Sequence, residues 1–332
     1  MTSTRVDPAR LVAGLARGDR LDLARAITLV ESRRPEDRRT AREVLSALPP
    51  RPVRSRRVGV TGPPGVGKST LIESLGLEVL SRSARLAVLA IDPTSGRTGG
   101  SLLGDKTRMP RLSRHPDVFI RPSPSGDSIG GLAGATREAM LLVEAAGHDV
   151  VLVETVGVGQ TARALEGLVD TFVLLVSADG GDEIQGVKRG VLELADVVAV
   201  TKADGEGEER ARTMRATLEG ALTLAPPAEP DWRTPVLAVS ALEGRGVAEL
   251  WDAVLAHRAL LERGGRLEAR RREQDCAWFA RLVEEGGRRL LAADPDWTAR
   301  RAELERVVGE GRSTALAASE EALAWLAGKI GG

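Results

Sequence analysis

The chain has 332 residues with 47 basic and 47 acidic side chains, so its formal net charge is zero. This balance gives no reason to expect nucleic acid or an anionic membrane as a partner. The single cysteine, Cys276, excludes an intramolecular disulfide, and three histidines leave a metal site of nitrogen and sulfur ligands poorly supplied. The first residues scatter charges instead of forming an apolar leader, and no apolar run is long enough to span a bilayer. We therefore expect a cytoplasmic protein.

The N-terminal part, residues 1–52, is predicted to be helical. Apolar residues recur at helical spacing, and Pro49, Pro50 and Pro52 then stop helix formation and mark a linker. The expected helices cover residues 8–17, 21–31 and 35–47. The arginines that follow, between positions 51 and 57, indicate a solvated junction more than a nucleic-acid site.

Residues 53–261 alternate short apolar strands with helical patterns, which is typical of an α/β domain. The expected strands are residues 58–61, 86–92, 118–121, 150–154, 171–177, 197–201 and 236–240. Several are continuous apolar runs, as expected when helices cover both faces of the sheet. The pattern predicts a doubly wound, mostly parallel sheet that binds its ligand at the carboxyl ends of the strands.

Residues 262–332 change in character and form a predicted helical extension. The sequence indicates one long charged helix and two further helices. These helices are expected at residues 266–292, 297–308 and 313–327. Three of the five tryptophans lie here, namely Trp278, Trp297 and Trp325. Packing within the chain and a dimerisation arm explain this enrichment equally well.

A phosphate-binding loop follows the first strand. Residues 62–69 fit the pattern G-x-x-x-x-G-K-[ST] and lie between a predicted strand and a helix expected at 69–80, which is the context that the motif requires. Backbone N–H groups of such a loop surround phosphate oxygens, Lys68 would reach the β- and γ-phosphates, and the Ser69 hydroxyl would hold Mg²⁺. The expected phosphate-binding residues are Gly62, Pro63, Pro64, Gly65, Val66, Gly67, Lys68, Ser69 and Thr70.

Two further strand ends favour guanine as the base. Thr201, Lys202 and Asp204 fit the pattern [NT]-K-x-D, in which the carboxylate accepts hydrogen bonds from guanine N1–H and its exocyclic amine. At the next strand end, Ser240, Ala241 and Leu242 form a tripeptide whose backbone N–H would contact guanine O6. Together with the phosphate loop, these segments make GTP a better interpretation than ATP.

Acidic residues at other strand ends are candidates for the metal. Asp92 and Glu154 both end apolar strands, where carboxylates can hold Mg²⁺ directly or through its waters. Glu154 replaces the aspartate of the usual Asp-x-x-Gly, so an outer-shell contact is expected. Asp105 is a further metal or water-orienting candidate, although a solvated loop position explains it nearly as well. The glycine-rich segments 96–105 and 123–134 are interpreted as switch loops or as ordinary surface turns.

These motifs resemble those of the MeaB/ArgK family of G proteins, which includes homologues of the methylmalonic aciduria type A protein. The resemblance covers nearly the whole chain and rests on five segments. They are GPPGVGKST at 62–70, DPTS at 92–95, GGSLLGDKTRM at 99–109, VETVGVGQ at 153–160 and DGGDEIQGVK at 179–188. The last is similar to an additional switch segment of the family.

The resemblance implies a homodimeric GTPase that chaperones an adenosylcobalamin-dependent acyl-CoA mutase, usually methylmalonyl-CoA mutase. Such proteins gate the loading of the cofactor and protect the mutase. Lys68, Asp105 and Glu154 would serve hydrolysis of GTP to GDP with Mg²⁺, while Gln160 matches the family without an assigned role. Intrinsic turnover should be slow until the partner orders the switches, because hydrolysis depends on positioning. Thr201 departs from the usual asparagine of the family.

Three alternatives remain open at this level. A small-molecule kinase of the arginine-transport type would need a second substrate pocket, and the motif at 201–204 argues against it. A metal-insertion GTPase of the same class would need histidine and cysteine ligands, which this chain largely lacks. A scaffold that binds nucleotide without hydrolysing it differs only in turnover.

Overall fold

A computed structural model describes residues 6–49, 55–92, 109–124, 129–155, 160–179, 189–223, 229 and 231–330. The chain divides into two compact units, Met1–Gln274 and Asp275–Gly332. The boundary falls within one long helix, α13 (Arg266–Ala293). In the described part of the chain, no helix is both long and apolar enough to cross a membrane.

The first unit is built on a sheet of seven parallel strands in the order β3-β2-β4-β1-β5-β6-β7. The strands are β1 (Arg56–Thr61), β2 (Leu86–Asp92), β3 (Val118–Pro124), β4 (Val150–Thr155), β5 (Thr171–Ser177), β6 (Val197–Thr201) and β7 (Val236–Val239). Strand order runs in opposite directions on the two sides of β1, which places the topological switch point, and hence the expected ligand site, at the carboxyl end of β1. The predicted doubly wound sheet is confirmed.

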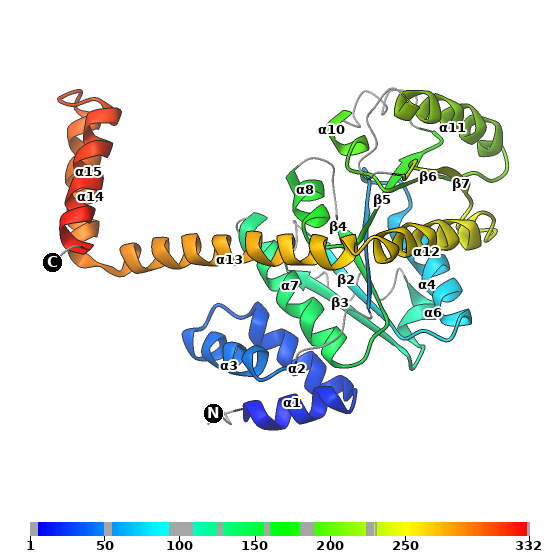
Figure 1. Ribbon diagram of the computed structural model, residues 1–332, viewed down its shortest axis with the longest axis horizontal. Coiled ribbons are helices and arrows are strands. Elements are labelled where there is room, and N and C mark those ends of the chain that lie inside the picture. The colour runs from blue at the N-terminus through cyan, green and yellow to red at the C-terminus, as the bar shows by residue number, and fades with distance from the viewer. Residues whose placement is uncertain are drawn as a thin grey trace. The chain divides into compact units, whose positions relative to one another are not determined.

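Helices cover both faces of the sheet (Figure 1). They are α4 (Lys68–Ser81), α6 (Pro110–Ser113), α7 (Ile129–Ala145), α8 (Gln160–Glu166), α10 (Arg189–Leu192), α11 (Gly207–Thr223) and α12 (Val247–Arg263). Successive residues of a strand point to opposite faces, so Leu86 and Val88 belong to the buried cluster that includes residues of α4, α6 and α12, while Ala87 and Leu89 belong to the cluster that includes residues of α7, α8 and α11. Burial on both faces explains why the strands are continuous apolar runs.

The N-terminal helices belong to the same compact unit as the sheet. They are α1 (Pro8–Ala16), α2 (Arg20–Glu31) and α3 (Pro35–Ser46). The Asp19 carboxylate caps α2 by accepting from the N–H groups of Leu21 and Asp22, and the apolar face of α2 is buried against α7. Arg38 of α3 forms a two-fold hydrogen-bonded ion pair with Glu138 of α7, at 2.7 and 3.0 Å.

The beginning of α13 is fixed to the sheet through the buried carboxylate of Asp170, just before β5. This carboxylate accepts hydrogen bonds from the Arg57 N–H, from Arg258 of α12 and from Arg271 of α13, all between 2.7 and 2.9 Å. Burial disfavours its charged form, but Arg271 and Arg258 more than offset this, so the pKa of Asp170 stays below its ordinary value. The two helices are therefore tied to the amino ends of β1 and β5.

The second unit contains the rest of α13 together with α14 (Pro295–Gly309) and α15 (Ala315–Ile330). Trp297 and Trp325 pack against each other with ring centroids 6.0 Å apart, and the Lys329 ammonium pairs with Asp294 and lies 5.0 Å from the Trp325 ring. Two of the three C-terminal tryptophans thus pack within the chain. Large apolar side chains of this unit nevertheless remain exposed in the single chain, namely Phe279, Leu282, Val283, Leu290, Leu316 and Leu323.

Candidate nucleotide-binding site

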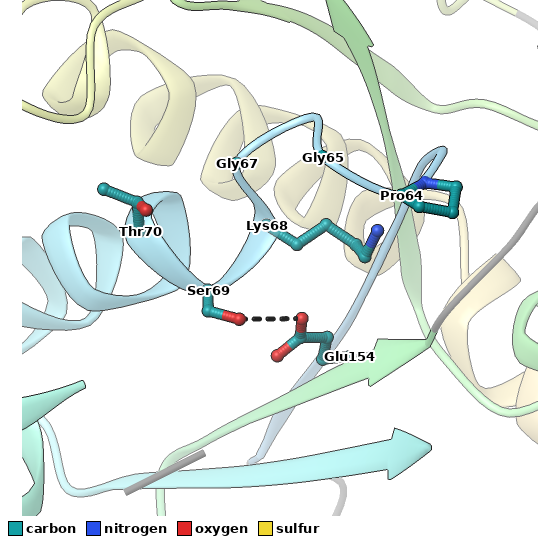
Figure 2. A pocket seen from close by; sticks show the side chains of 7 residues that line it. All are labelled: Pro64, Gly65, Gly67, Lys68, Ser69, Thr70 and Glu154. Atoms are coloured by element: carbon teal, nitrogen blue, oxygen red, sulfur yellow. Dashed lines mark hydrogen bonds between the residues drawn. The ribbon is translucent and has the colours of Figure 1, made fainter. Parts of the chain in front are cut away.

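The loop between β1 and α4 surrounds a cavity at the carboxyl end of β1. Gly65 and Gly67 have φ values of +79° and +94°, a conformation that side chains with a Cβ rarely adopt, so glycine is required at both positions. Gly67 is the N-cap of α4, whose first N–H groups have no partner within the helix and suit an anion. The cavity measures about 530 Å³ and is lined by Pro64, Gly65, Gly67, Lys68, Ser69, Thr70 and Glu154 (Figure 2).

Lys68 is held by the carbonyl oxygens of its own loop. Its Nζ donates to the carbonyls of Gly62 at 2.9 Å and Pro63 at 2.8 Å, and its side chain is largely buried. Burial lowers the pKa of Lys68 below its ordinary value, and the nearby Glu154 carboxylate opposes this shift. A phosphate in the cavity would offer this cation an anionic acceptor in place of two neutral carbonyls.

Ser69 and Glu154 come together at the wall of the cavity. The Ser69 hydroxyl donates to Glu154 Oε1 at 3.2 Å, across 85 positions of sequence (Figure 2). Strands β1 and β4 are neighbours in the sheet, and the Thr155 hydroxyl donates to that of Thr61 at 2.9 Å, so the carboxylate lies beside the start of α4. A hydroxyl and a carboxylate at a phosphate site form an oxygen donor set that fits Mg²⁺.

The other two acidic candidates are only partly placed. The backbone of Asp92 ends β2, which pairs with β4, but its side chain lies outside the described residues, as does Asp105. Segment 96–105 and most of 179–188 are likewise not described. The predicted loop 123–134 proves shorter, because β3 continues to Pro124 through pairing of Ser123 and Pro124 with β2, and α7 begins at Ile129.

Thr201 joins the base-recognition segment to the phosphate loop. Its hydroxyl donates to the carbonyl of Val66 at 2.7 Å and lies 3.3 Å from that of Val176. Thr201 ends β6, next to β5, and is buried. Threonine, the departure from the family pattern, therefore reaches the phosphate-loop backbone directly.

Asp204 and Ser240 meet at the ends of β6 and β7. The Ser240 hydroxyl donates to Asp204 Oδ2 at 2.6 Å and accepts from the Glu243 N–H at 3.1 Å. The hydrogen bond from Ser240 fixes the orientation of the Asp204 carboxylate. The second oxygen, Oδ1, can then accept from a base in a fixed direction, as base recognition requires. The two segments singled out in the sequence are therefore in contact, whereas the Leu242 side chain is exposed.

Arg210, which lies in no recognised motif, contacts a residue at the edge of this site. Lys202 has a φ of +60°, and its Nζ lies 3.4 Å from Asp179 Oδ2, while Arg210 of α11 donates to Asp179 Oδ1 at 3.0 Å. Asp179 is the first residue of the predicted switch segment 179–188. Arg210 lies beyond every recognised motif, and only the packing of α11 brings it to this carboxylate.

Comparisons with known proteins agree with this geometry. The family model described as methylmalonyl Co-A mutase-associated GTPase MeaB matches residues 23–295. The chain is 52% identical to a probable GTPase of Mycobacterium tuberculosis, over 94% of this chain and 93% of the relative. It is 43% identical to GTPase ArgK of Escherichia coli, with 87% of each covered, and 44% identical to the mitochondrial methylmalonic aciduria type A homolog of Mus musculus, over 83% and 69%. A crystal structure of a LAO/AO transport system kinase superposes with a TM-score of 0.77 at 34% identity, covering 96% of this chain and 97% of the other. The chain therefore belongs to the MeaB family of P-loop GTPases, which bind and hydrolyse guanine nucleotide.

Proposed function

We propose that this GTPase is a G-protein chaperone of an adenosylcobalamin-dependent acyl-CoA mutase of the methylmalonyl-CoA mutase type. In this role it gates the loading of the cofactor and protects the mutase from inactivation, in the cytoplasm. The observation that carries the proposal is the match of residues 23–295 to a family described as mutase-associated. The name of the mouse relative, a methylmalonic aciduria type A homolog, supports the same role.

The contacts of Lys68, Ser69 and Glu154 support a division of labour within the site. Ser69 and Glu154 would hold Mg²⁺, with Asp92 and Asp105 as further candidates, and the bound metal would supply charge stabilisation. Lys68 moves from the carbonyls of Gly62 and Pro63 to the β- and γ-phosphates. Asp105 and Glu154 serve the water and metal shell during hydrolysis.

The base-recognition residues complete the proposed site. Asp204 reads guanine N1–H and the exocyclic amine, with Ser240 fixing its orientation. The backbone of Ala241 and Leu242 faces O6, and the Lys202 stem covers the base. Thr201 holds this segment to the phosphate loop through Val66.

The proposed switch segment 179–188 couples this site to the mutase. Support comes from Asp179, which pairs with Lys202 of the base-recognition motif and with Arg210. The first residue of the segment is thus in contact with Lys202, which we propose covers the base.

A small-molecule kinase is the alternative with a specific observation behind it, because the solved structure with a TM-score of 0.77 is named a transport system kinase. The contact between Ser240 and Asp204, which orients a carboxylate for guanine, favours the G-protein role instead. A kinase would transfer the γ-phosphate to an acceptor such as arginine, whereas a G protein releases it to water.

Affinity capture from native extract tests the proposed partner. The full chain, loaded with GDP or with a non-hydrolysable GTP analogue, should retain a cobalamin-dependent acyl-CoA mutase, and the amount should differ between the two nucleotides. Capture in which such a mutase is present in the extract but stays unbound with both nucleotides contradicts the proposal.

A further inference from the structure

One hydroxyl in the phosphate-binding helix makes an unusual contact. Ser74 lies in α4, beyond the phosphate-loop motif, and its Oγ donates to the carbonyl of Ala241 at 2.6 Å, across 167 positions of sequence. Helical serine and threonine hydroxyls ordinarily bond to a carbonyl of the preceding turn. Elsewhere in this chain that pattern is followed by Thr28, Thr40, Ser81, Thr213, Thr217, Thr223, Thr298 and Ser319. Ser74 instead reaches out of its helix to the predicted guanine loop.

The loop that Ser74 contacts, residues 240–245, is closed by a backbone hydrogen bond between its two ends. The Ser240 N–H donates to the Arg245 carbonyl at 2.9 Å, and α12 begins at Val247 immediately afterwards. Residues 242–245 are exposed, whereas Ala241 is half-buried. The contact with Ser74 therefore fixes the loop at the point where it leaves the protein surface.

The peptide group between Ala241 and Leu242 is the part of this loop whose orientation matters most for base recognition. Its carbonyl, from Ala241, accepts a hydrogen bond from Ser74, while its N–H, from Leu242, donates to no acceptor within the described residues. The peptide group is planar and trans, so fixing the Ala241 carbonyl also fixes the direction of the Leu242 N–H, which points the opposite way. A donor with a fixed direction is what recognition of a single base oxygen requires.

We propose that Ser74 is a positioning residue for guanine recognition, acting through the Ala241 carbonyl to aim the Leu242 N–H at guanine O6. The inference rests on the proposed guanine site. It makes α4 a common support for both ends of the nucleotide, since its first turn faces the phosphates and Ser74 holds the loop that reads the base. Recognition of the base and of the phosphates would then share one rigid element.

The test measures affinity for GDP and for ADP with the full chain. In Ser74→Ala, GDP affinity should fall by about 3- to 10-fold, the effect of one lost hydrogen bond. ADP lacks O6 and so makes no contact with the aimed N–H. Its weak affinity should therefore stay within about two-fold of the wild-type value, as is usual for a substitution that removes no interaction with the ligand. Ser74→Thr retains a hydroxyl and should recover GDP affinity. Ser81→Ala, which removes a hydroxyl bonded within the same helix, should leave both affinities unchanged.

Other outcomes overturn the inference. Equal losses for GDP and ADP in Ser74→Ala would mean that Ser74 supports only the fold, and an unchanged GDP affinity would mean that the contact does not aim the donor. The proposed guanine site itself is tested separately by the wild type. Equal affinities of the wild type for GDP and ADP would contradict the guanine site and, with it, the role of Ser74.

Discussion

At the scale of single residues, the nucleotide site is arranged by hydrogen bonds that join distant parts of the sequence. Thr201 reaches the carbonyl of Val66, and Ser240 reaches Asp204. Lys68 is held by carbonyls of its own loop, in a buried position that lowers its pKa. Binding of a nucleotide therefore has to displace the contacts of Lys68 with these carbonyls, and the affinity reflects the difference between the contacts that Lys68 loses and those that it gains.

Asp204→Asn tests the base-reading carboxylate. The substitution keeps the shape but replaces one acceptor oxygen by an NH₂ donor, which faces the guanine amine. GDP affinity should fall by roughly 2–4 kcal/mol, because buried guanine donors are left unpaired. Xanthosine diphosphate carries an oxygen where guanine has the amine and should bind the variant better than GDP does. Equilibrium binding of both nucleotides decides this, and unchanged GDP affinity contradicts the assigned role of Asp204.

At the scale of elements, most of the sheet could be predicted from the sequence. Strands 171–177 and 197–201 have the predicted bounds, because buried parallel strands are continuous apolar runs. β3 continues past the predicted residue 121 through Pro122 and Pro124. Proline cannot donate to a ladder and argues against a strand, but β3 lies at the edge of the sheet, where a missing donor is tolerated.

The contacts within the site could be predicted less well. The motifs identify Lys68, Ser69 and Asp204 because phosphate and guanine chemistry demands fixed residue types at fixed spacing. Ser74 and Arg210 carry no such pattern. Their contacts with Ala241 and Asp179 depend on how α4 and α11 pack against loops far away in the sequence, which periodicity does not encode.

His148, between α7 and β4, gives the fold a pH dependence. Its Nδ1 donates to the Val143 carbonyl at 2.9 Å, and burial lowers the pKa of His148 to about 4 from 6.5. Between these values the unfolded chain binds a proton that the folded chain does not. The contribution of His148 to stability is therefore complete above about pH 6.5 and is lost as the pH falls toward 4, at about 1.4 kcal/mol per pH unit.

Urea unfolding of wild type and His148→Gln at pH 7, 6 and 5 measures this contribution. The free energy of unfolding of the variant should fall less steeply with decreasing pH, so the two curves converge toward pH 5. The same substitution at the partly exposed His115 controls for loss of a histidine as such. Parallel curves for wild type and His148→Gln would show that His148 is not the source of the slope.

At the scale of the whole molecule, the second unit is the proposed dimerisation region. Trp297 and Trp325 pack within the chain, but Phe279, Leu290 and Leu323 are each at least 65% exposed. Large apolar side chains gathered on a monomer surface mark interaction sites. A second copy of the chain, which the resemblance implies, is the proposed partner for these residues.

Light scattering of the full chain, as wild type and as a double variant that combines Phe279→Glu with Leu290→Glu, tests this proposal. Wild type should be a dimer at micromolar concentration, and the double variant should be a monomer, because a carboxylate buried at an apolar interface is strongly disfavoured. Leu21→Glu, at an equally exposed position of α2, should remain dimeric. A monomeric wild type, or a dimeric double variant, contradicts the proposed interface.

The central claim is that the GTP state of this protein is coupled to a mutase through segment 179–188. Coupling is reciprocal in binding free energy, so a mutase that prefers one nucleotide state must alter nucleotide affinity by the same factor. Asp182→Ala combined with Lys188→Ala changes the segment and leaves Lys68, Ser69 and Asp204 in place. The variant should therefore keep basal hydrolysis.

The most direct measurement is GTP turnover with and without a cobalamin-dependent acyl-CoA mutase, for wild type and for this double variant. We expect the mutase to stimulate turnover of the wild type, and we expect the variant to lose that stimulation at unchanged basal turnover. Equal stimulation of both proteins would place the coupling outside segment 179–188. Wild-type turnover that no acyl-CoA mutase alters would contradict the chaperone function itself.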